Sequence, residues 1–218
     1  ARRVASYLKS LGLPERSSIA LCSKNCAHWI LADLAIWMAG HVSVPLFHVL
    51  TADIVAYILK HSEARLLFVG KLDDPVWDQM KPGVPADLPT VALPLATDSG
   101  YLKWDDIVAD NAPLRECAAC PADETATIVY TSGSMGRPKG VMATHRNVWH
   151  NATHFGEVHF QPTDTIMVAT PIFHCWGLVV HFLFCFFCSV LECFVMYSVS
   201  FVVVCDEWCV EWCVVCSV

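Results

Sequence analysis

The first 70 residues alternate between short apolar runs and segments with helical periodicity, and this alternation restricts the fold more than any other feature. Strands are predicted at 18–21, 42–46 and 65–69, and helices at 4–11, 26–38 and 52–61. The strands are continuously apolar, which is typical of strands buried on both faces. Such strands separated by helices predict an α/β fold, a partial layered domain with a mainly parallel sheet.

Residues at the ends of these segments support the assignment. Gly12 and Gly40 follow two of the predicted helices, where glycine commonly ends a helix. Asn25 and Thr51 each precede a predicted helix, where a short polar side chain can cap the first turn. The helix boundaries are therefore predicted by residue type as well as by periodicity.

Prolines recur between residues 71 and 121 and exclude a long helix or strand there. This part is predicted to be a winding surface connection, with a short helix near 104–108. A strand is expected again at 125–130, where Thr, Ile, Val and Tyr are concentrated.

Thr131 to Gly140, directly after this strand, combine backbone flexibility with hydrogen-bond donors and one basic side chain. The segment contains three hydroxyl residues, three glycines and a lysine: Thr131, Ser132, Gly133, Ser134, Gly136, Lys139 and Gly140. Glycines allow the backbone N–H groups to approach a polyphosphate closely. The segment therefore predicts a nucleotide-phosphate loop, and an ordinary Ser/Gly turn is the alternative.

Two other phosphate motifs do not fit this segment. Counting a GxxxxGK[ST] motif from Gly133 places Pro138 where the second glycine belongs. Gly133 and Gly136 are three residues apart, which does not match GxGxxG.

The segment from Tyr130 to Met142, followed by 144–147, resembles the phosphate loop of the AMP-forming adenylate-forming synthetases. Residues 167–177 are similar to that family's next motif, and 23–29 and 40–45 to its first subdomain. Among the family's members, the chain is most similar to the long-chain fatty-acyl-CoA synthetases. It is thereby identified as an incomplete amino-terminal portion of a ligase of this kind.

This resemblance implies ATP, Mg²⁺ and CoA as ligands, and a fatty acid or another carboxylate as substrate. The carboxylate would attack the α-phosphorus of ATP to give acyl-AMP and pyrophosphate, and the CoA thiol would then release AMP. The seven loop residues from Thr131 to Gly140 would surround the β- and γ-phosphates, and His174 would line the acyl and adenylate pocket.

Departures from the family pattern limit what the chain is expected to do alone. Met135 replaces a usual Thr or Ser, and no acid matches the family's magnesium ligand. No segment resembles the later Tyr-Gly-x-Thr-Glu or Thr-Gly-Asp motifs, or the small domain with the catalytic lysine. A truncated, inactive copy is therefore expected, and a nucleotide-binding pseudoenzyme or a membrane-anchored fragment is the alternative.

The last part of the chain has a different composition. No Lys or Arg follows Arg146, and residues 181–218 are rich in Val, Phe and Cys. We expect a partial AMP-binding domain at 1–180 and an aberrant, frame-changed tail at 181–218. Residues 178–204 contain one charge, Glu192, and are long enough to cross a bilayer, so membrane association through them is the alternative.

Charge, cysteine and histidine usage bear on partners and location. The 21 acids exceed the 14 bases, which argues against a nucleic-acid partner. Without an export signal, the reducing cytoplasm is the expected location, and Cys117 and Cys120 are expected to be free thiols. The histidines outside residue 174 lack metal-ligand spacing and are expected at the surface or at helix caps, and a four-cysteine site at 205–216 is disfavoured.

Overall fold

The computed structural model describes residues 1–97, 100–131, 136–154, 166–167, 200–202 and 213–215, with side chains as far as His150. Contacts divide the chain into two compact units, 1–145 and 146–218. The predicted boundary at 180 lies outside the described residues and stays a prediction.

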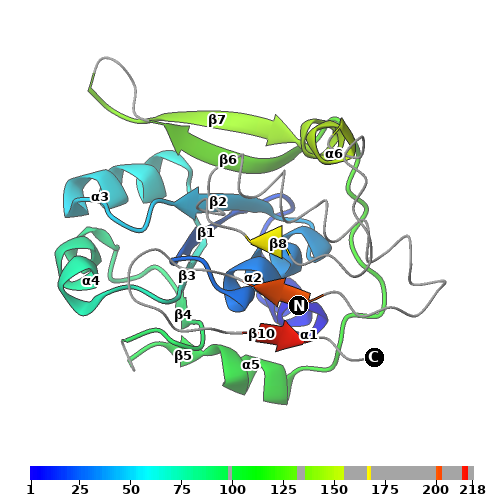
Figure 1. Cartoon of the computed structure of the whole chain (residues 1–218), viewed down its shortest axis with the longest axis horizontal. Helices are drawn as coiled ribbons and strands as arrows, with labels where there is room; N and C mark the ends of the chain where they lie inside the picture. Colours follow the sequence, from blue (N-terminus) through cyan, green and yellow to red (C-terminus); the bar gives the residue numbers. More distant parts are fainter. Residues whose placement is uncertain (98–99, 132–135, 155–165, 168–199, 203–212, 216–218) are drawn as a thin grey trace. The chain divides into compact units, whose positions relative to one another are not determined.

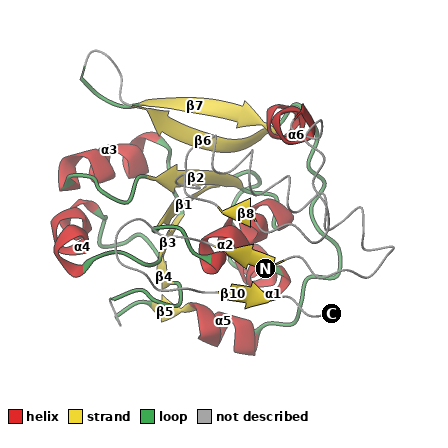
Figure 2. Cartoon of the chain, viewed as in Figure 1, coloured by secondary structure: helices red, strands yellow, loops and turns green. Residues whose placement is uncertain are grey.

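The first unit is built on one seven-stranded sheet. Its strands are β1 (Ser18–Cys22), β2 (Val42–Leu46), β3 (Leu66–Val69), β4 (Thr90–Ala92), β5 (Leu102–Lys103), β6 (Thr125–Thr131) and β7 (Lys139–Thr144). The strand order is β5-β4-β3-β1-β2-β6-β7, seen from bottom to top in Figure 2. All neighbouring strands are parallel except β6 and β7. The predicted α/β fold with a mainly parallel sheet is confirmed.

Helices cover both faces of this sheet (Figure 1). The helices are α1 (Arg2–Ser10), α2 (Ala27–Met38), α3 (Ala52–His61), α4 (Asp74–Met80), the 3-10 helix η1 (Lys81–Gly83) and α5 (Trp104–Asp110). Val44, Leu46 and Val69 pack under α3 and α4, and Phe68 contacts Trp104 of α5 on the other face. The strands are buried on both sides because alternate residues face these two helical layers.

The predicted elements before residue 70 occur within a residue or two of their expected ends. Gly12 and Gly40 have φ values of +62° and +84°, so both helix-ending glycines are confirmed. The predicted cap at Asn25 is wrong, because Cys26 occupies the N-cap of α2. Thr51 is at the N-cap of α3, but its side chain makes no capping hydrogen bond.

The segment 71–121 is more ordered than a surface connection, which corrects that prediction. The helix α4 begins at Asp74, and Pro75 in its first turn loses no helical hydrogen bond. Trp77, Met80 and Val91 are buried, and β4 and β5 extend the sheet beyond β3. Prolines prevented long elements here, as expected, but left room for short ones.

The second unit contains most of α6 (His145–His154) and a three-stranded sheet. The strands are β8 (Ile166–Met167), β9 (Ser200–Val202) and β10 (Cys213–Val215), in the order β10-β9-β8. The strand β9 is parallel to β8 and antiparallel to β10. Among the described residues, no helix is both long and apolar enough to cross a membrane. Of residues 178–204, the alternative membrane segment, only 200–202 are among the described residues.

Candidate functional site

The candidate phosphate loop is the turn of the β6–β7 hairpin. Thr131 at the end of β6 pairs with Lys139 at the start of β7, and Tyr130 pairs with Gly140. The sequence indicated a strand before the loop but not the antiparallel strand after it. Helix α6 then begins at His145, where the resemblance placed a helix start.

The structure describes part of the predicted site. Thr131 and Lys139 are exposed at the two stems of the loop, and Gly136 is exposed within it. Ser132, Gly133 and Ser134 lie outside the described residues, as do Met135 and His174. The acyl pocket implied for His174 therefore stays a prediction.

Glycine is required at two positions of the loop region for different structural reasons. Gly136 has a φ of +113°, which strains any residue with a Cβ. No atom of the described residues lies within 4 Å of where a Cβ would be. At Gly140 a Cβ would lie 2.9 Å from Cγ2 of Ile128 and 3.2 Å from the ring of Tyr130. Gly136 therefore leaves the loop backbone open to a ligand, whereas Gly140 lets the hairpin pack closely.

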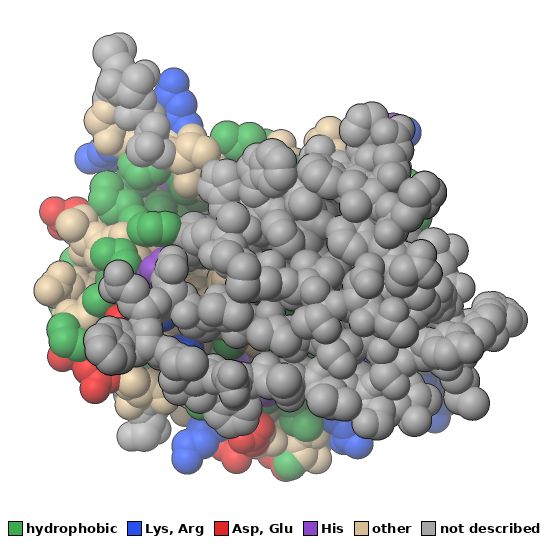
Figure 3. Space-filling view, viewed as in Figure 1, with side chains coloured by type: hydrophobic (Ala, Val, Ile, Leu, Met, Phe, Trp, Pro, Cys, Tyr) green, Lys and Arg blue, Asp and Glu red, His purple; other side chains and the backbone are tan. Residues whose placement is uncertain are grey.

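Basic side chains lie beside this loop and form no ion pair with the acidic side chains that the structure describes. Arg137 and Lys139 are both exposed, and basic atoms flank the hairpin tip in Figure 3. The two ion pairs among the described side chains, Arg16–Glu124 and Lys24–Asp73, involve neither of them. An open backbone and two cations are the features that a polyphosphate requires.

The base of the loop rests on aromatic residues of α3 that sequence reasoning did not select. The Tyr130 hydroxyl lies 2.6 Å from Nδ1 of His61, and the guanidinium of Arg137 lies 5.1 Å from the ring centroid of Tyr57. Burial raises the pKa of Tyr130, and the nearby Tyr57 raises it further, against a lowering by the Ser62 hydroxyl. Tyr130 is therefore protonated at neutral pH and can share its proton with His61. The only sequence signal was the spacing of Tyr57 and His61, four residues apart on one helix face.

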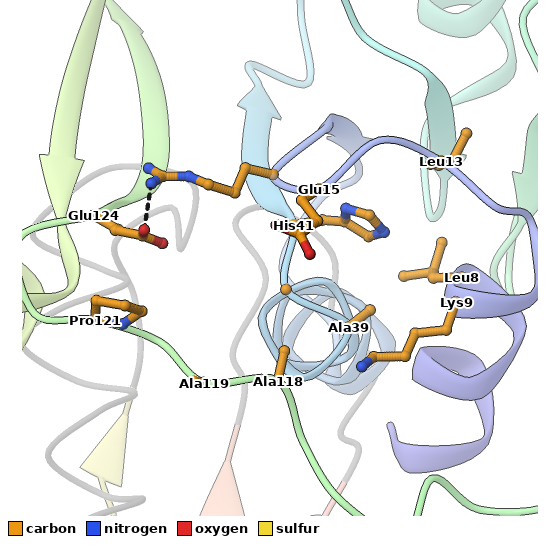
Figure 4. A pocket seen from close by; sticks show the side chains of 12 residues that line it. Leu8, Lys9, Leu13, Glu15, Ala39, His41, Ala118, Ala119, Pro121 and Glu124 are labelled. Atoms are coloured by element: carbon orange, nitrogen blue, oxygen red, sulfur yellow. Dashed lines mark ion pairs between the residues drawn. The ribbon is translucent and has the colours of Figure 1, made fainter.

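A separate pocket of about 460 Å³ lies at the other end of β6 (Figure 4). Glu124, just before β6, forms a 2.7 Å ion pair with Arg16, and His41, just before β2, also lines this pocket. His41 is buried rather than at the surface, and its backbone N–H caps the end of α2 by donating to the carbonyl of Ile36, as expected for a histidine at a helix cap. Burial, and secondarily Lys9, lowers its pKa, which favours the neutral ring. Thr131, Gly136, Lys139 and Gly140, the described residues of the predicted loop, do not line this pocket.

Neither a metal centre nor a redox pair is found in the described part of the chain. No group of three His, Cys, Asp or Glu side chains there could hold a metal ion. Cys117 and Cys120 are free thiols, as predicted. Burial, then Cys117 and Glu124, raises the pKa of Cys120, which disfavours its reactive thiolate. The four-cysteine arrangement at 205–216 lies outside the described side chains.

The mostly parallel sheet and the glycine-bearing hairpin loop define an α/β protein with a candidate polyphosphate site. Residues 1–210 match the AMP-binding enzyme family, and the chain belongs to that family. Its relatives are acyl-CoA ligases, which confirms the resemblance drawn from the loop motif.

Two relatives and one solved structure illustrate this similarity. The 2-succinylbenzoate–CoA ligase of Bacillus licheniformis is 32% identical over 82% of the chain and 34% of its own length. Fatty acyl-CoA synthetase A of Dictyostelium discoideum is 31% identical over 85% of the chain and 30% of its own length. The anthranilate CoA ligase AuaEII, solved with anthranoyl-AMP, superposes with a TM-score of 0.74 at 23% identity, covering 85% of the chain and 36% of that protein. The chain thus spans about a third of the length of the curated relatives it matches.

Proposed function

We propose that the loop 131–140 binds the β- and γ-phosphates of ATP, and that the chain serves the AMP-forming activation of a fatty acid to acyl-AMP and then acyl-CoA. The observation that carries the proposal is an exposed lysine, Lys139, at the stem of a glycine loop in a member of the AMP-binding enzyme family. Lys139 has no ion pair with any side chain that the structure describes. The fatty acid is favoured by the resemblance of residues 23–29 and 40–45 to fatty-acid-activating members.

The loop's contribution is electrostatic. When the carboxylate oxygen attacks the α-phosphorus, the bond to the bridging oxygen breaks and negative charge develops on pyrophosphate. Lys139 and the backbone N–H groups around Gly136 stabilise that charge and hold the phosphates in place. Mg²⁺ bound with the nucleotide would supply further positive charge. No acidic ligand set for it occurs in the described residues.

The proposal also covers the carboxylate substrate, the cellular location and whether the chain alone turns over its substrate. The relatives' names include both a succinylbenzoate ligase and a fatty acyl-CoA synthetase, so the family admits several carboxylates. We favour a cytoplasmic protein with peripheral membrane contact. We further propose that these 218 residues alone bind nucleotide without activating the acid, since no segment of the sequence resembles the family's ribose-binding motif or its domain with the catalytic lysine.

Calorimetric titration with Mg-ATP tests the binding step. Lys139→Ala is expected to weaken binding by about tenfold or more, because a charge-assisted contact to phosphate is lost. Lys103→Ala is the matched control, since Lys103 is an exposed lysine in β5 at the far edge of the sheet. Equal effects of the two substitutions would contradict the site.

An acyl-hydroxamate assay tests turnover, because hydroxylamine intercepts acyl-AMP. ATP-dependent hydroxamate from a fatty acid would refute inactivity and support the ligase. Binding without hydroxamate is the result expected for the chain alone. The pseudoenzyme alternative is tested by adding the family's ribose-binding motif and its domain with the catalytic lysine. It requires that the extended chain still bind ATP but release no pyrophosphate.

A further inference from the structure

One face of α3 carries two stacked rings directly beneath the loop stems. Tyr57 and His61 are separated by one helical turn, with ring centroids 5.3 Å apart and planes inclined by 33°. In Figure 1 the hairpin end from which the loop leaves lies above α3. The pair is therefore placed to contact the beginning and the end of the loop at once.

The beginning of the loop is held through Tyr130. Its hydroxyl lies 2.6 Å from Nδ1 of His61, and the two rings meet edge to face at a centroid distance of 5.7 Å. Tyr130 is the residue immediately before Thr131. A fixed Tyr130 consequently fixes the direction in which the chain enters the loop.

The end of the loop is held through Arg137. The guanidinium lies 5.1 Å from the centroid of the Tyr57 ring, within the range of a cation–π interaction. Arg137 lies two residues before Lys139, and Pro138 between them restricts the backbone. Holding Arg137 therefore also limits where Lys139 can lie.

We propose that Tyr57 and His61 are positioning residues for the phosphate loop, with His61 acting through Tyr130 and Tyr57 acting through Arg137. This inference rests on the proposed function of the loop in binding polyphosphate. Fixing both stems before a ligand arrives lowers the conformational entropy lost on binding. His61 and Arg137 are exposed side chains, so their contacts add little to the packing of the core and act locally on the loop.

The test compares hydrogen exchange of the 131–139 peptide without nucleotide and the affinity for Mg-ATP in the same variants. His61→Phe keeps the ring but loses the hydrogen bond, and is expected to speed loop exchange and weaken binding by about fivefold. Tyr57→Leu removes the cation–π contact, with an expected effect of about two- to fivefold. The thermal midpoint of unfolding is expected to stay unchanged in His61→Phe, because His61 is exposed. Tyr57 is half-buried against the core, so a small drop in the midpoint is expected in Tyr57→Leu, and its loop exchange is compared below that midpoint.

A rescue variant and a double variant distinguish a positioning role of His61 from a general structural role. His61→Gln can still hydrogen-bond Tyr130 and should restore most of the affinity. Tyr130→Phe combined with His61→Phe should cost no more than either change alone, because both remove the same bond. His28→Phe is the control, since His28 is a half-buried histidine in α2 that contacts Trp104 rather than the loop.

The outcomes distinguish this inference from the function on which it rests. Faster loop exchange in the His61 and Tyr57 variants, with no ATP binding by any chain, would support the anchor and refute the phosphate site. ATP binding that requires Lys139 but does not change in these variants would refute the anchor alone. Equal effects of His28→Phe, or no rescue by His61→Gln, would also overturn the inference.

Discussion

Asp33 is a fully buried carboxyl group between α2 and the sheet, outside the candidate site. Among the described residues, neither carboxylate oxygen has a hydrogen-bond partner of normal geometry, and its polar neighbour is the hydroxyl of Ser43 on β2. Burial raises the pKa of Asp33 to about 7, and the nearby Ser43 opposes this rise only in part. The folded chain therefore keeps a proton that the unfolded chain, with a pKa of 3.8, loses at much lower pH.

This difference predicts that stability falls as pH rises from about 4 to about 7, because the folded state binds the additional proton throughout that range. Asp33→Asn should remove this dependence and make the chain more stable than the wild type at pH 8, on the order of a few kcal/mol. Urea unfolding at pH 5 and pH 8 measures the effect. Burial lowers the pKa of His28, His41 and His145, which favours stability above about pH 6.5 in both proteins, so the comparison isolates Asp33. Parallel pH profiles would contradict the assignment.

The β6–β7 hairpin combines a candidate site with a tightly packed base. Gly140→Ala would place a Cβ 2.9 Å from Ile128, so the two strands would have to separate at Tyr130. We expect a loss of about 1–3 kcal/mol in stability, together with weaker ATP binding. Thermal unfolding and titration on the same samples measure the two effects. Ala143→Gly is the control, because it exchanges the same two residue types in the same strand. If Ala143→Gly weakened ATP binding as much as Gly140→Ala, the effect would not come from close packing at Gly140.

The elements that could be predicted from sequence share strong local signals. The strands β1, β2 and β3 are apolar runs, and positive-φ glycines follow α1 and α2. The strands β4 and β5 have three and two residues, too few to show a period, and are specified by pairing with their neighbours. The strand β7 was missed because Val141 and Met142 are exposed on an edge strand, where burial leaves no pattern.

The same distinction between local signals and tertiary contacts applies to the candidate site. The loop could be found from residue types, because glycines, hydroxyls and a lysine are local requirements for binding phosphate. Tyr57 and His61 could not be found that way, because their partners lie about 70 to 80 residues further along the chain. Their role depends on α3 packing beneath the hairpin, which is a property of the tertiary structure.

At the scale of the molecule, the described loop residues and the α3 side chains beneath them lie within one unit. Residues 1–145 contain the seven-stranded sheet, both stems of the loop, and Tyr57 and His61. We therefore predict that a chain ending at residue 154 binds Mg-ATP within about twofold of the full 218 residues, because rigid elements set the loop position. Titration of both chains tests this, with Lys139→Ala in each as the control for site-specific binding. Loss of binding in a shortened chain that still unfolds cooperatively would show that residues 155–218 contribute contacts to the nucleotide, and the site would then extend into the second unit.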